Sequence, residues 1–233
     1  MMLIVNLALA VGPAAIVLFW AYRRDKARRE PPRLVLGAFG LGIVAVAAAI
    51  VVGLFVDPFA RAFSATGALL FRAYVVAGVL EEAAKLAVVL YFISRHEEFD
   101  EVADGMVYTM AASLGFAVVE NVLYLAGPSA VLLLRGLTAV PLHAAAGGLM
   151  GYFVGLYRIE GRGSVFAGLL AAVALHGTYD YLLFAGVYSS SLLLSFATIP
   201  LLVGSAILVA LLFRSAVRRD RSAGRVPQDL TPE

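Results

Sequence analysis

Residues 68–94 read ALLFRAYVVAGVLEEAAKLAVVLYFIS, an apolar stretch of bilayer-spanning length that carries Glu81, Glu82 and Lys85 near its middle. A helix needs about 20 apolar residues to cross the hydrocarbon core of a membrane. A charged side chain at that depth costs at least about 2.5 to 3.5 kcal/mol on insertion scales. This segment is therefore expected to be a membrane helix whose charged residues mark a site.

Six further apolar stretches surround this one, at residues 3–22, 34–56, 106–126, 130–157, 164–187 and 191–213. The chain is 62% hydrophobic and 15% charged, with a mean hydropathy of +0.91, which excludes a soluble globular protein. The alternating pattern of a β-barrel is missing, so the spans are expected to be helices. The prediction is an all-α polytopic bundle of about seven transmembrane helices, forming one domain over residues 1–213. The polar tail, residues 214–233, is expected to be disordered and cytoplasmic.

Basic residues predict the orientation of this bundle. Lys and Arg gather in residues 23–33, in residues 158–163 and after Arg214, whereas the connections on the opposite side hold only Arg61. Short loops rich in Lys and Arg lie in the cytoplasm, so the N-terminus is expected outside and the C-terminus inside. The net charge of +2 therefore reflects membrane orientation and not nucleic-acid binding. The absence of cysteine excludes thiol nucleophiles and thiolate metal sites.

Ionisable and polar residues occur inside four successive predicted spans. They are Glu81, Glu82 and Lys85, then Glu120 and Asn121, then Arg135 and His143, and finally His176 and Asp180. Lys85 lies one turn from both glutamates, so it can neutralise one carboxylate and leave the other free. A single such pair also fits ordinary helix packing. Four spans that each supply such groups favour one shared site, because isolated burial of each group would be costly. Arg135, near a span end, is expected to extend to the outer interface.

These residues, in order, resemble the motifs of a known family. Glu81-Glu82-x-x-Lys85, Phe116-x-x-x-Glu120-Asn121, His143 and His176-x-x-x-Asp180 are similar to the motif set of the PrsW family, polytopic intramembrane proteases of glutamic type. The resemblance covers residues 69–181, the expected motif-bearing core. It implies peptide hydrolysis in the cell membrane of a prokaryote, with a single-span substrate such as an anti-sigma factor. The related CAAX-processing proteases carry His where this chain has Glu120, so their Glu and His pair cannot be transferred unchanged.

Amide hydrolysis needs a base to activate water, a donor for the oxyanion and an acid for the leaving amine. Either Glu81 or Glu82 suits the role of base, and the family resemblance favours Glu81. His143 and His176 are expected to supply the oxyanion donor and the acid, with Asp180 orienting His176. Four residues have supporting roles in this interpretation: Lys85 sets the charge balance, Phe116 belongs to the motif, and Glu120 or Asn121 holds water or substrate.

Other interpretations of the same residues stay open. We expect no cofactor, and a zinc site ranks lower because HExxH is missing and His176-x-x-x-Asp180 supplies only two ligands. A proton-coupled transporter would use the same groups as a relay, although inverted repeats are not evident. A third possibility is a scaffold that binds a partner helix in a polar groove.

Overall fold

The computed structural model describes residues 2–24 and 30–225 of the chain. Each predicted apolar stretch is helical. The elements are α1 (Met2–Arg24), α2 (Pro32–Val56), the 3-10 helix η1 (Asp57–Ala62), α3 (Ala65–Phe71), the π-helix η2 (Arg72–Val79), α4 (Leu80–Val88), the π-helix η3 (Val89–Ile93), α5 (Val102–Leu123), α6 (Ser129–Leu137), α7 (Ala139–Glu160), α8 (Val165–Tyr188), α9 (Leu192–Phe196) and α10 (Thr198–Ser222).

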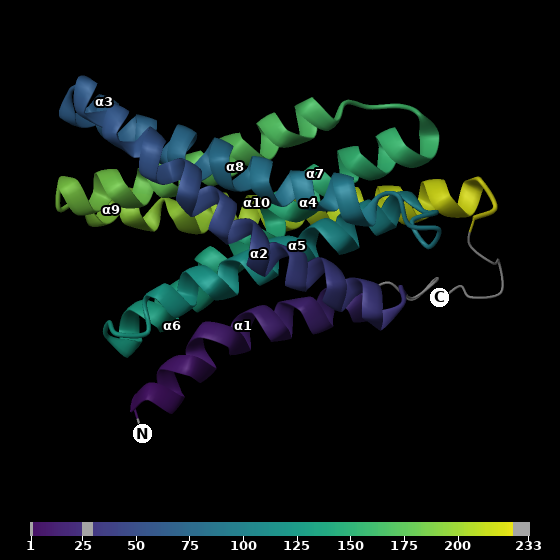
Figure 1. Ribbon diagram of the computed structural model, residues 1–233, viewed down its shortest axis with the longest axis horizontal. Helices are drawn as coiled ribbons and strands as arrows, with labels where there is room; N and C mark the ends of the chain where they lie inside the picture. The colour runs from purple at the N-terminus through teal and green to yellow at the C-terminus, as the bar shows by residue number, and fades with distance from the viewer. Residues whose placement is uncertain (1, 25–29, 226–233) are drawn as a thin grey trace.

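The all-helical membrane fold is confirmed. Six helical segments of the described part are long and apolar enough to cross a membrane. The seventh predicted span is the helical run formed by α3, η2, α4 and η3, whose charged residues set it apart from the other six. Figure 1 shows the helices running back and forth between two ends of the bundle, with the start of α1 at one end and the end of α10 at the other. The side of the membrane on which each end lies stays a prediction.

Helix α5 forms the centre of the bundle and packs most extensively against α7 and α2. Glycines make this possible, because a Cβ atom on Gly105 would collide with the backbone of α7 at Gly151 and Gly155. Small residues allow membrane helices to approach closely, as the glycines of residues 147–155 suggest. The α5 and α7 backbones are therefore held at a fixed register, which positions the polar side chains that these helices carry.

The C-terminal segment differs from the prediction of disorder after Arg214. Helix α10 continues to Ser222, and the buried carboxylate of Asp220 accepts hydrogen bonds from the backbone N–H groups of Val102 (2.9 Å) and Ala103 (3.1 Å). These are free N–H groups of the first turn of α5, which need acceptors. Asp220 thus caps α5 and fixes the end of α10. The predicted disorder of residues 226–233 lies outside the described residues.

Candidate active site

The polar residues of α4 lie on one short α-helix between two π-helical segments, a feature common at functional sites. Lys85 Nζ lies 2.7 Å from Glu82 Oε1 and 3.5 Å from Glu81 Oε2. The Lys85 and Glu82 side chains are fully buried. Lys85 therefore pairs mainly with Glu82 and leaves Glu81 less engaged, as the spacing predicts.

His176 of α8 faces both glutamates. Its Nδ1 lies 2.7 Å from Glu82 Oε1, whereas its Nε2 lies 3.9 Å from Glu81 Oε2 and 3.4 Å from Asp180 Oδ2. Glu82 can only accept, so the Nδ1–H group of His176 donates to it. The shortest contact that orients this ring therefore comes from Glu82 and not from Asp180, and the ring presents Nε2 to Glu81 and Asp180.

His143 of α7 is hydrogen-bonded through both ring nitrogens. Lys85 Nζ lies 2.9 Å from His143 Nδ1, and Glu120 Oε2 lies 2.7 Å from His143 Nε2. An ammonium has only donors, so Nδ1 accepts and the Nε2–H group donates to Glu120. The ring centroid lies 5.0 Å from that of His176. The two predicted histidines thus meet, in one continuous network with Lys85 and Glu82.

Phe116 of α5 packs against this network. Lys85 Nζ lies 4.2 Å from the centroid of the Phe116 ring, whose centroid is 6.0 Å from that of His143. The ring face offers the buried ammonium a favourable cation–π contact. Phe116 therefore supports Lys85.

Arg135, which the sequence analysis expected to extend to the outer interface, is hydrogen-bonded to two residues of the network. Its Nε donates to Asn121 Oδ1 (2.8 Å) and its Nη2 to Glu120 Oε2 (3.3 Å). Asn121 also donates to Ala10 O of α1 (3.3 Å). Asn121 thus links Arg135 to α1, and the expectation that Glu120 or Asn121 holds water or substrate stays a prediction. The sequence carried one signal for this, because Arg135 precedes His143 by two helical turns on the same predicted span.

Tyr179 and Thr138 were missed by the sequence interpretation. The Tyr179 hydroxyl donates to Thr138 Oγ1 (2.7 Å), which joins α8 to the break between α6 and α7. A buried tyrosine usually needs a hydrogen-bond partner, so its place beside Asp180 was the available signal. This contact fixes the helix that carries Asp180 relative to the one that carries His143.

The site has a buried side and a partly open side. At most 4% of the His143, His176, Glu82 and Lys85 side chains is exposed, compared with 15% for Glu81, 16% for Asp180 and 23% for Glu120. The Oε2 atom of Glu81 is buried without a hydrogen-bond partner among the described residues. Along the helical run, Glu81 lies about 24 Å from Ala65 and about 18 Å from Ile93. Glu81 therefore lies near the middle of this helical run.

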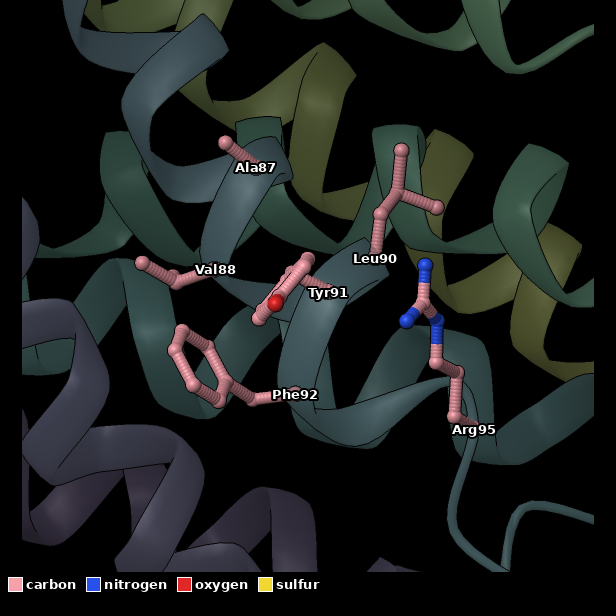
Figure 2. Close-up of a pocket in the computed structure, with 6 residues that line it drawn as sticks. All are labelled: Ala87, Val88, Leu90, Tyr91, Phe92 and Arg95. Atoms are coloured by element: carbon pink, nitrogen blue, oxygen red, sulfur yellow. The ribbon is translucent and has the colours of Figure 1, made fainter.

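A separate hollow of about 460 Å³ lies beyond Lys85 along the same helical run. Figure 2 shows its lining residues, with Val88, Tyr91 and Phe92 side by side on η3 and the end of α4. Arg95 places its guanidinium 4.9 Å from the centroid of the Tyr91 ring. An arginine stacked on an aromatic ring at a span end is typical of a membrane interface. This hollow is distinct from the polar network.

Three groups of the network suit a zinc ion by type. Glu81, His143 and His176 each place one ligand atom within 4.8 Å of the others, and two histidines with one glutamate form a known zinc ligand set. His176 fits best, because Glu82 holds its other nitrogen in the manner of a metal-bound histidine. His143 does not fit in this arrangement, because both of its nitrogens are hydrogen-bonded.

Known proteins resemble this chain over the whole network. Residues 30–212 match a family model described as PrsW family intramembrane metalloprotease. The Protease PrsW of Geobacillus kaustophilus is 35% identical over 179 residues, which cover 75% of this chain and 78% of the relative. The Protease PrsW of Bacillus subtilis is 33% identical over 180 residues, which cover 75% and 81%. That of Clostridioides difficile is 30% identical over 185 residues, which cover 75% and 77%. No solved structure matches the chain.

Proposed function

The chain belongs to the PrsW family of intramembrane proteases, and from this premise we propose that it hydrolyses a peptide bond by means of a water activated by Glu81. The proposed substrate is a single-span membrane protein such as an anti-sigma factor, cut at or near its spanning segment. The proposed location is the cell membrane of a bacterium. A site near the middle of the helices supports a substrate that is itself a membrane helix.

One observation carries the proposed mechanism. Glu81 Oε2 is buried and, like Glu82 Oε2, has no hydrogen-bond partner among the described residues; it lies 3.5 Å from Lys85 Nζ and 3.9 Å from His176 Nε2. The latter separation is too long for a direct hydrogen bond and suits a water that contacts both atoms. Glu82, by contrast, contacts both Lys85 and His176 through Oε1 at 2.7 Å, and its side chain is fully buried, whereas that of Glu81 is 15% exposed. The geometry therefore supports Glu81 as the base.

The proposed reaction uses one water and one peptide bond. Glu81 takes a proton from the water, whose oxygen attacks the carbonyl carbon of the substrate. The bond from carbon to nitrogen then breaks, and the amine takes the proton that Glu81 received, through His176 as the nearest proton-transfer group. Products are a carboxylic acid and an amine, so atoms and charge balance. His143 and Lys85 are positioning residues in this scheme, because each is fully engaged with neighbouring side chains.

Zinc-dependent hydrolysis is the second candidate, favoured by the family description and by the convergence of Glu81, His143 and His176. These three residues would hold the ion, which would polarise the substrate carbonyl as a Lewis acid. His143 would have to release either Lys85 or Glu120 to become a ligand. This requirement is the reason for the preference for the carboxylate mechanism.

The test of function uses the purified full chain in liposomes with a single-span reporter protein. We expect two cleavage products, identified by mass spectrometry, and their loss in the Glu81→Gln variant. Glu97→Gln is the matched control, because Glu97 is an exposed carboxylate in the loop after η3. Intact reporter together with proton-dependent uptake of a solute would instead support the transporter.

A separate measurement distinguishes the two chemistries. The purified protein is analysed for bound metal, and cleavage is then measured after treatment with a strong chelator. The carboxylate mechanism predicts less than one metal ion per ten chains and unchanged cleavage. Stoichiometric zinc, with activity that is lost on chelation and restored by zinc, would overturn it and make Glu81, His143 and His176 the ligands.

A further inference from the structure

A second concave site lies at the end of the bundle where α10 terminates. A pocket of about 670 Å³ opens between the turn after α7 and the last turns of α10. Gly161 ends α7 in the left-handed conformation (φ 62°) and sends the chain back, which brings Arg162 to the rim. The pocket is defined by its basic side chains, Arg162, Arg218, Arg219 and Arg225, and is called the arginine pocket below.

The α10 side of the arginine pocket is a stripe of polar side chains at helical spacing. Ser215, Arg218, Arg219 and Ser222 lie three or four residues apart, so they share one face of the helix. Ser222 donates its hydroxyl to Arg218 O (2.8 Å) and Arg218 Nε donates to Arg214 O (3.3 Å), so the terminal guanidinium nitrogens of Arg218 are the donors on this face that remain for a ligand. The stripe thus contributes guanidinium donors to a ligand in the pocket.

The charges in the arginine pocket are unbalanced. Its one carboxylate, Glu160, binds Arg219 (3.0 Å) and Arg225 (3.4 Å). Arg162 and Arg218 have no carboxylate partner in the part of the chain that the structure describes. Two guanidinium groups are therefore available for a ligand, and guanidinium binds phosphate oxygens with paired hydrogen bonds.

The position of the arginine pocket along α10 indicates which kind of phosphate compound it binds. The apolar part of α10 ends at Phe213. Ser215, the first α10 residue of the pocket, comes two residues later, about 3 Å along the helix axis. Ile207, Leu208 and Leu211 of α10 are exposed on the N-terminal side of Ser215 and would contact hydrocarbon in a membrane. A lipid phosphate at the rim could thus keep its acyl chains along α10. We propose that the arginine pocket binds the headgroup phosphate of an anionic phospholipid.

The experiment is a binding titration of the purified, delipidated full chain in neutral detergent, followed by native mass spectrometry. Phosphatidylglycerol should bind at least tenfold more tightly than phosphatidylcholine or free glycerol 1-phosphate. Each arginine near a lipid surface contributes about a fivefold gain in affinity, so Arg162→Gln with Arg218→Gln should weaken binding about 25-fold. Neither residue forms an ion pair in the described chain, so this variant should fold.

Arg33→Gln with Arg95→Gln is the matched control, because both are exposed arginines at the same end of the bundle and outside the arginine pocket. This control should change the affinity for phosphatidylglycerol less than twofold. Equal weakening in the control and in the pocket variant would overturn the proposal and indicate general surface charge. Glycerol 1-phosphate binding as tightly as the lipid would also overturn it, in favour of a soluble phosphate ligand.

Discussion

Lys85→Met tests the ion pair on which the buried side of the site depends. The substitution keeps a long unbranched side chain that can still pack on Phe116, and it removes the ammonium that lies 2.7 Å from Glu82 and 2.9 Å from His143. Glu82 is fully buried, so its carboxylate loses the only close cation of fixed charge that the described residues provide. His143 also loses the donor to Nδ1.

The expected loss of stability is large. Breaking a buried ion pair by removing one partner costs about 3 to 5 kcal/mol, because the remaining charge is left without compensation in a low-dielectric region. Lys85→Met together with Glu82→Gln removes both charges, and the amide oxygen that the Glu82→Gln change introduces can still accept from His176. The double variant should therefore recover about 2 kcal/mol relative to the sum of the two single variants.

The assay is reversible unfolding of the purified protein in mixed micelles, with unfolding free energies for the wild type, both single variants and the double variant. Arg72→Met is the control, because it breaks the Arg72 and Asp57 pair at 2.8 Å whose side chains are 45% and 44% exposed. That exposed pair should contribute about 0 to 1 kcal/mol. Additive effects of Lys85→Met and Glu82→Gln, or a Lys85 effect no larger than that of Arg72, would refute the reasoning.

Three further predictions concern other contacts. Asp220→Ala removes the acceptor for the first N–H groups of α5 and should lower the unfolding free energy by about 1 kcal/mol in the same assay; no change would mean that the end of α10 does not fix α5. Gly105→Val places side-chain atoms in the backbone of α7, so monodisperse protein should not be recovered on size exclusion, and a normal yield would contradict the close approach. Arg135→Gln should slow reporter cleavage about tenfold while stability changes little, because Glu120 loses a charged donor; an unaffected cleavage rate would show that Arg135 does not position the site.

The fold was predictable because hydropathy alone identifies segments that can cross a bilayer. Less predictable were the interruptions inside those segments. Hydropathy does not reveal the π-helical turns before Glu81 and after Val88, or the break at Thr138, where the Tyr179 hydroxyl donates to Thr138. The helical end of α10 is held by the contact between Asp220 and the backbone of Val102 in α5. The polar composition of residues 214–233 does not reveal this long-range contact.

The sequence predicted which residues form the site, but not which of them contact one another. Buried charges are costly unless they are paired, so residues on four spans were expected to meet, and the structure brings them together. The partners themselves follow from the rotation and register of each helix, which glycine contacts between α5 and α7 determine. This is why Glu82 instead of Asp180 makes the short contact with His176, and why Arg135 pairs with Glu120.

The central claim is that Glu81 activates the attacking water, and the most direct measurement is the single-turnover cleavage rate of Glu81→Gln, with the unfolding free energy of the same sample. Because Lys85 lies closer to Glu82 (2.7 Å) than to Glu81 (3.5 Å), and Glu81 Oε2 has no hydrogen-bond partner among the described residues, Glu81→Gln should leave stability within about 1 kcal/mol of wild type. The rate should fall by about 100- to 10,000-fold, the usual contribution of a general base. A rate within tenfold of wild type in the folded variant would contradict the assignment of Glu81.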